Sequence, residues 1–183
     1  MLKHIITTRC FLPCTLPIKH LPEHVDIDEL NRRYKVLAQD YSDILITGGE
    51  PTCHSQLDVI SQTAKMYFNN VFLQTSNRLA LADPKYNKYT AVWFSGFQFN
   101  FPLVLNGHPV FACINADQFC TRLPAYLKQR GYQGILIYPQ GKAELELPQE
   151  NDFEIKFLEE AQRVLLPSLK LLGSHKLKHE KQD

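Results

Sequence analysis

Two short stretches of this sequence contain residue types that could hold a cofactor. Cys10 and Cys14 lie in a segment with two prolines, which exclude a regular helix or a central strand there. The second stretch, Thr47-Gly-Gly-Glu-Pro51, directly follows the apolar residues 44–46. Thiolates bind metal ions and iron–sulfur clusters, and a carboxylate can pair with a ligand cation. These residues are therefore the first candidates for a functional site.

The second stretch has the composition of a turn between a buried strand and a helix. Gly48 and Gly49 permit backbone conformations with positive φ and let a ligand come close, because no Cβ stands in the way. Pro51 favours extended geometry at Glu50 and suits the first turn of a helix. In parallel α/β folds, ligands bind at the carboxyl ends of the strands, where this turn would lie.

The apolar pattern predicts the elements that position these residues. Six short strands are expected, at residues 4–9, 44–46, 71–75, 91–94, 110–114 and 134–138. Four helices are expected. The first is capped by Asp26 or Asp28, and the second starts near Ser55. The third is capped by Asp117 and bent at Pro124, and the fourth spans residues 152–166. Residues 78–90 are predicted to be irregular, with a turn at Asp83-Pro84.

Continuously apolar strands of this kind are typical of a parallel sheet covered on both faces, so the fold class is predicted to be α/β. Right-handed crossovers would give either an open doubly wound sheet or a partial β/α barrel. In both folds, the carboxyl ends of the strands would meet at one rim. The residues at these ends are Cys10, the turn at 48–50, Ser76-Asn77, Ser95-Gly96, Asn115 and Tyr138-Pro139.

Length and composition limit the classes of function. The 183 residues predict a single domain at 1–172 and a polar, disordered tail at 173–183. A net charge of +1 gives no signal for nucleic acid, and no apolar run is long enough to span a membrane. We expect a cytoplasmic protein. Its five cysteines favour reduced thiols or a metal site over a disulfide framework.

The two stretches together resemble the radical S-adenosylmethionine (radical SAM) superfamily. The relevant residues are Ile-Thr-Thr-Arg-Cys10-Phe-Leu-Pro-Cys14-Thr-Leu-Pro17 and Thr47-Gly-Gly-Glu-Pro51. The order is similar too, with a cysteine loop after the first strand and the Gly-Gly-Glu-Pro turn after the second. The resemblance implies a single-domain partial (β/α)6 barrel.

The resemblance also implies a [4Fe–4S] cluster whose open iron binds S-adenosylmethionine. Cys10 and Cys14 match the first two cluster ligands, and Leu16 matches the apolar position beside the cofactor. The third cysteine of the family pattern is replaced by Pro17, which has no ligand atom. Cys53 and His20, with His24 nearby, are the candidates for a substitute ligand. Alternatively, Cys53 is a small residue at a helix start and the histidines lie in a solvated loop.

By the same resemblance, Gly48, Gly49 and Glu50 bind the methionine amino group. Ser76, Asn77 and Ser95 would contact the ribose or the carboxylate. The other interpretation is that these residues are ordinary strand-end caps and that Glu50 is a solvated loop carboxylate. Cys113 and Cys120 are predicted to be buried structural thiols.

Two functions from different classes follow. The first is an enzyme that cleaves S-adenosylmethionine reductively to a 5′-deoxyadenosyl radical and takes electrons from a flavodoxin or ferredoxin. The second is a degenerate, noncatalytic module that binds a nucleoside-like ligand or a protein partner, with Phe97–Phe101 as a contact surface. A zinc site at Cys10 and Cys14 with His20 or His24 ranks last, since a fourth ligand is not evident.

Overall fold

The computed structural model of the chain describes residues 1–9, 24–95, 108–138, 153–158, 163–166 and 171–173. It divides into two compact units, one formed by Met1–Gln74 with Ala161–Asp183 and the other by Thr75–Glu160. In both units helices accompany a sheet of parallel strands, so the predicted α/β class is confirmed.

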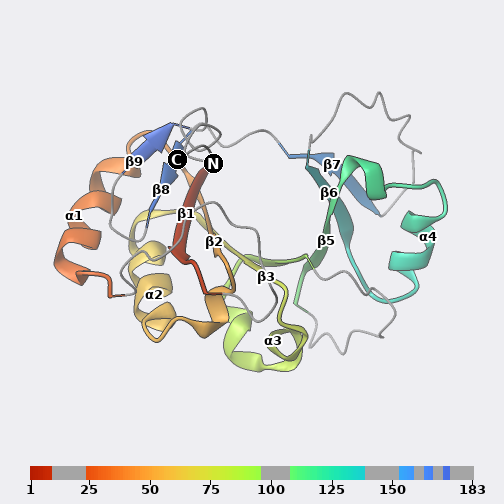
Figure 1. Ribbon diagram of the computed structural model, residues 1–183, viewed down its shortest axis with the longest axis horizontal. Coiled ribbons are helices and arrows are strands. Elements are labelled where there is room, and N and C mark those ends of the chain that lie inside the picture. Colours follow the sequence, from red (N-terminus) through yellow and green to blue (C-terminus); the bar gives the residue numbers. More distant parts are fainter. Residues whose placement is uncertain (10–23, 96–107, 139–152, 159–162, 167–170, 174–183) are drawn as a thin grey trace. The chain divides into compact units, whose positions relative to one another are not determined.

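The first unit contains a sheet in the order β3-β2-β1-β8-β9 (Figure 1). Its strands are β1 (Leu2–Thr7), β2 (Asp43–Gly48), β3 (Asn70–Thr75), β8 (Arg163–Leu165) and β9 (Leu171–Gly173). Pairing is parallel except between β8 and β9, which are antiparallel. Its helices are α1 (Ile27–Leu37) and α2 (Leu57–Tyr67), with the 3₁₀ turn η1 (Pro51–Cys53) before α2.

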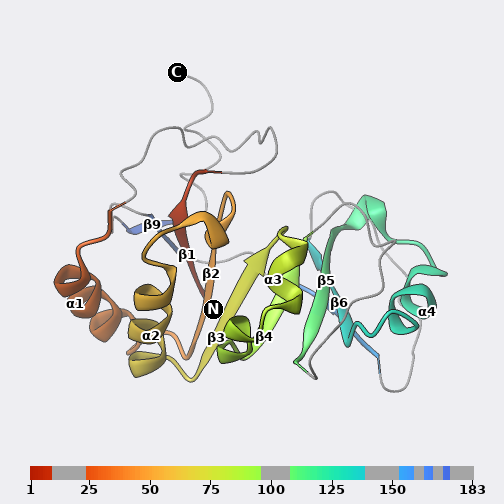
Figure 2. The same cartoon turned by 90° about the horizontal axis from the view of Figure 1, so that it is seen from below.

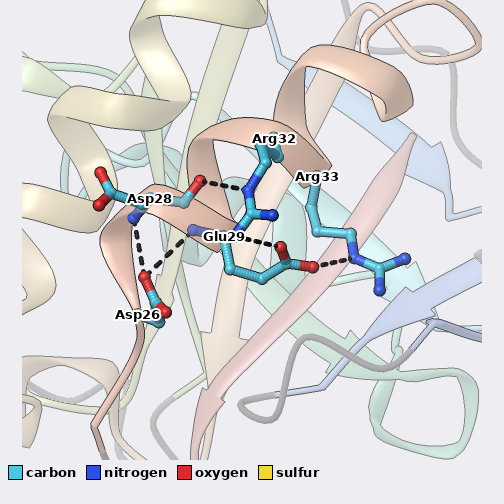
Figure 3. Close-up of polar contacts among 5 residues, drawn as sticks. All are labelled: Asp26, Asp28, Glu29, Arg32 and Arg33. Atoms are coloured by element: carbon cyan, nitrogen blue, oxygen red, sulfur yellow. Dashed lines mark hydrogen bonds and ion pairs between the residues drawn. The ribbon is translucent and has the colours of Figure 1, made fainter.

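Helix α1 begins where the sequence predicts. The Asp26 carboxylate accepts hydrogen bonds from the backbone N–H groups of Asp28 and Glu29, at 3.0 and 3.2 Å (Figure 3). On the exposed side, Glu29 pairs with Arg32 and Arg33, one helical turn further on. On the other side, Leu30, Tyr34 and Leu37 are buried. Helices α1 and α2 lie side by side (Figures 1 and 2).

The second unit contains four parallel strands in the order β7-β6-β5-β4. They are β4 (Ala91–Phe94), β5 (Val110–Asn115), β6 (Gly134–Tyr138) and β7 (Glu154–Phe157). The helical elements are α3 (Arg78–Ala82), η2 (Pro84–Lys88), η3 (Ala116–Gln118) and α4 (Leu123–Lys128), of which α4 packs beside β6 (Figure 2). Its core includes Val92, Phe94, Ala112, Ile114, Leu127, Ile135, Ile137 and Phe153.

All six predicted strands are present, but the helix predicted at 152–166 is wrong. Residues Glu154–Phe157 form β7, which pairs with β6, and Arg163–Leu165 form β8, which pairs with β1. Residues 164–166 are all buried. A surface helix buries only one stripe of its circumference, and three consecutive residues do not fit on such a stripe. Backbone pairing with distant strands therefore overrides the helical spacing of the apolar residues.

The segment 78–90, predicted to be irregular, contains two short helical elements. Asp83 accepts the backbone N–H of Lys85 at 3.0 Å and begins η2, with Pro84 at its first position. The helix expected after Asp117 is divided into η3 and α4. Pro124 lies in the first turn of α4 rather than in the middle of a longer helix. Among the described residues, no helix has the length and apolar character needed to cross a membrane.

Candidate functional site

The carboxyl ends of β1 and β2 are joined beyond the regular pairing of the two strands. Thr7 pairs with Gly48 after a bulge. The N–H of Gly49 then donates to the Thr7 carbonyl at 2.8 Å, and the N–H of Glu50 donates to the Arg9 carbonyl at 2.6 Å. Arg9 precedes Cys10 by one peptide bond. The end of the described segment that leads to the cysteines is thus hydrogen-bonded to the Gly-Gly-Glu-Pro turn.

Gly48 and Gly49 are required by the close approach of two backbone segments. Gly48 has a φ of +142°, and a Cβ added there would lie 2.3 Å from the Thr7 carbonyl oxygen. At Gly49 an added Cβ would lie 2.0 Å from the Arg9 carbonyl oxygen. Both distances are shorter than any real contact. The space that the sequence suggests for a ligand is, at these two Cβ positions, taken by the end of β1.

The side chain of Thr7 also fixes this end of β1. Thr7 is buried, and its hydroxyl oxygen accepts the N–H of Arg9 at 3.1 Å. Its carbonyl accepts the N–H of Gly49, so one residue anchors both the residue before Cys10 and the glycine turn. Sequence reasoning missed Thr7. Its only signal is a threonine at the strand end, where such local side-chain-to-backbone bonds are common.

Glu50 is fully buried, so the interpretation of a solvated loop carboxylate is wrong. Its backbone is extended, as Pro51 requires, with φ −133° and ψ 100°. Its carboxylate oxygen Oε1 accepts the hydroxyl of Thr52 at 2.7 Å and the N–H of Thr52 at 3.1 Å. Glu50 therefore caps η1, and Pro51 occupies the first position of that turn as predicted. The α-helix itself starts only at Leu57.

Cys53 is half-buried in η1, and its N–H donates to the Glu50 carbonyl at 3.0 Å. It is thus the described thiol closest in sequence to the turn. Over the described ranges, no group of three or more His, Cys, Asp or Glu side chains could hold a metal ion. Cys10, Cys14, Leu16, Pro17 and His20 lie outside those ranges, and so does the predicted contact surface at 97–101.

The remaining predicted contacts, Ser76, Asn77 and Ser95, belong to the second unit. The N–H of Ser95 donates to the Thr75 carbonyl at 3.0 Å, and the N–H of Asn77 donates to the Thr75 hydroxyl at 2.9 Å. The Asn77 side chain accepts the N–H of Leu79 at 3.1 Å, within the first turn of α3. Capping interactions, which the sequence left as an alternative for these residues, are therefore present at Asn77.

Two predictions concern the other thiols. Cys113 is buried in β5, as expected for a structural thiol. Cys120 is exposed between η3 and α4, so the prediction that it is buried is wrong. The helix expected to continue from Asp117 stops at Gln118, and α4 begins only at Leu123, so Cys120 lies between the two helical elements.

A buried histidine within β1 was not singled out from the sequence. His4 is fully buried, and its Nδ1 lies 2.6 Å from the hydroxyl of Tyr34 in α1. Burial, and next the charge of His54, lower the pKa of His4 from 6.5 to about 3. Its Nε2 atom has no hydrogen-bond partner among the described residues. A neutral imidazole is therefore built into the side of the sheet that α1 covers.

No protein-family model matches the chain, and a search of curated proteins finds no match. What the chain does is therefore inferred from its motifs and from the geometry of the strand ends.

Proposed function

We propose that this chain is a radical-SAM-like protein that binds an iron–sulfur cluster and S-adenosylmethionine at the carboxyl ends of β1 and β2. The observation that carries the proposal is the hydrogen bond from the N–H of Glu50 to the Arg9 carbonyl. A cofactor that bridges the cysteine segment and the Gly-Gly-Glu-Pro turn needs these two stretches next to each other.

The strand order supports the finer proposal of a partial (β/α)6 barrel. Within the first unit β1, β2 and β3 are parallel neighbours in chain order, and within the second so are β4, β5 and β6. Chain order is the order of a β/α barrel, whereas a doubly wound sheet reverses direction at a switch point. Strand β8, on the other side of β1, is an addition to that pattern.

In this proposal Cys10 and Cys14 supply two thiolate ligands, and Cys53 or His20 supplies the third. Cys53 fits this role in part, because it is half-buried and directly follows the turn. A cluster held there would supply one-electron reduction of S-adenosylmethionine, which gives methionine and a 5′-deoxyadenosyl radical. The turn at 48–50 would lie at the methionine amino group, and Leu16 would lie beside the cofactor. A flavodoxin or ferredoxin in the cytoplasm would be the electron donor.

Two observations favour the second candidate, a noncatalytic module that binds a nucleoside-like ligand or a protein partner. The carboxylate of Glu50 is fully buried and accepts two hydrogen bonds from Thr52. In addition, Pro17 stands where the family has its third cysteine. A chain that kept the barrel and lost the cluster would show both features.

The two candidates are separated by anaerobic reconstitution with iron and sulfide, followed by iron counting and a visible absorption spectrum. The first predicts about four irons per chain, as in clusters held by thiolates. Cys10→Ser and Cys14→Ser should each abolish iron binding. The same loss is expected from Cys53→Ser or from His20→Ala, whichever residue supplies the third ligand. Cys120→Ser, which removes an exposed thiol far from the motifs in sequence, is the matched control. Wild-type protein without iron would leave only the noncatalytic candidate.

A further inference from the structure

The residue that the motif resemblance assigns to a ligand has a different set of contacts in this chain. Glu50 is fully buried and makes hydrogen bonds in two directions. Its backbone N–H reaches the Arg9 carbonyl at 2.6 Å, at the end of β1. Its carboxylate Oε1 accepts the N–H and the hydroxyl of Thr52, at the start of η1. One residue therefore ties the segment before Cys10 to the turn that leads toward α2.

We infer that Glu50 is a positioning residue, whose buried carboxylate holds the turn between β2 and η1 in place rather than binding the ligand. A buried carboxylate is costly unless hydrogen bonds or a cation compensate for its lost hydration. Two donors from Thr52 converge on one carboxylate oxygen and give that compensation from within the chain. Recognition of an amino group at this turn then falls to its main chain, not to the side chain of Glu50.

The inference is tested first on unfolding, which requires no cofactor. Thr52→Val removes the hydroxyl donor and keeps the backbone N–H, whereas Thr52→Ser keeps both. In urea unfolding of the full chain, Glu50→Ala and Thr52→Val should each raise the unfolding equilibrium constant, and Thr52→Ser should leave it near the wild-type value. The double variant Glu50→Ala/Thr52→Val should deviate from additivity by about tenfold, as expected for a charge-assisted hydrogen bond.

The second arm uses S-adenosylmethionine binding and rests on the proposed function. Glu50→Gln keeps the acceptor oxygen and the size of the side chain but removes the charge. If the carboxylate only holds the turn, the dissociation constant of this variant stays within about threefold of wild type. A carboxylate paired with the ligand's ammonium would instead lose about tenfold or more in affinity without the charge.

Additive effects of Glu50→Ala and Thr52→Val would overturn the inference. So would a Glu50→Gln variant that unfolds like wild type but binds S-adenosylmethionine more than about tenfold more weakly. Wild-type protein that binds no S-adenosylmethionine would overturn the proposed function, and the unfolding cycle would still decide the role of Glu50.

Discussion

The N–H of Glu50 lies 2.6 Å from the carbonyl oxygen of Arg9, and this contact joins two segments that are about forty residues apart in sequence. It continues the parallel pairing of β1 with β2 beyond the last paired residues, Thr7 and Gly48. Arg9, the residue before Cys10, therefore lies beside the Gly-Gly-Glu-Pro turn. This arrangement and three other features of the fold lead to four predictions that are independent of any bound cofactor.

Gly49→Ala is expected to destabilise the fold strongly. The new methyl group would lie 2.0 Å from the Arg9 carbonyl oxygen, and backbone atoms cannot move aside as a flexible side chain can. We expect a loss of about 2–4 kcal/mol in the free energy of unfolding, measured by urea denaturation monitored by circular dichroism.

The control for this variant is Gly131→Ala. Gly131 has a φ of 84° in the turn after α4, so alanine there has a conformational cost of about 1–2 kcal/mol. A Gly49→Ala variant no less stable than Gly131→Ala would mean that β1 and β2 are not held together at this point.

The stability of the protein should fall as the pH decreases from about 6.5. The pKa of His4 is about 3 in the folded protein, against 6.5 as its ordinary value. Between these two values the unfolded chain binds a proton that the folded chain does not, so acid favours unfolding. The contribution of His4 amounts to at most about 5 kcal/mol over this range. Urea midpoints measured from pH 8 to pH 4 would show the slope.

The origin of this slope can be assigned with two variants. His4→Leu combined with Tyr34→Phe removes the imidazole together with the hydroxyl 2.6 Å from it, and should flatten the pH dependence. Tyr34→Phe alone should keep it, because burial is the first cause of the lowered pKa of His4. An unchanged slope in the double variant would exclude His4 as the source.

Asp26→Ala should shorten or loosen the start of α1. The carboxylate of Asp26 accepts the N–H groups of both Asp28 and Glu29, and loss of such a cap costs about 1 kcal/mol (Figure 3). Asp26→Asn should recover most of this loss, since an amide oxygen can still accept. Thermal or urea unfolding measures the difference.

Arg33→Ala provides the comparison on the same helix. Its ion pair with Glu29 is 2.7 Å long, but the Arg33 side chain is 51% exposed, so water screens the pair. We expect a change of less than about 0.5 kcal/mol. Equal losses from Asp26→Ala and Arg33→Ala would contradict the assignment of Asp26 as the cap.

The thiols should react in an order set by burial. In a Cys10→Ser/Cys14→Ser background three cysteines remain: Cys120 is exposed, Cys53 is half-buried and Cys113 is buried. With an aromatic disulfide reagent, Cys120 is expected to react first and Cys53 more slowly. Cys113 should react only as fast as the protein unfolds. Rapid reaction of Cys113 in the folded protein would contradict its position in β5.

Much of the fold follows from local patterns in the sequence. The runs Ile44–Ile46, Ala91–Phe94 and Gly134–Tyr138 are short, apolar and bounded by turn residues, and each forms a strand. Asp26 and Pro51 start a helix and a 3₁₀ turn because capping and a fixed φ are properties of the residues themselves. Such features depend on a few neighbouring residues, and the sequence alone is sufficient to predict them.

The tertiary structure decided the rest, because pairing between distant segments has no local signal. Residues 154–157 and 163–165 have apolar spacing compatible with a helix, yet β6 and β1 offer backbone partners that make them strands. The turn at 48–50 shows the same dependence. Its glycines were predicted from their conformational freedom, but the contact that requires them is the end of β1, and the burial of Glu50 results from the chain packed around it.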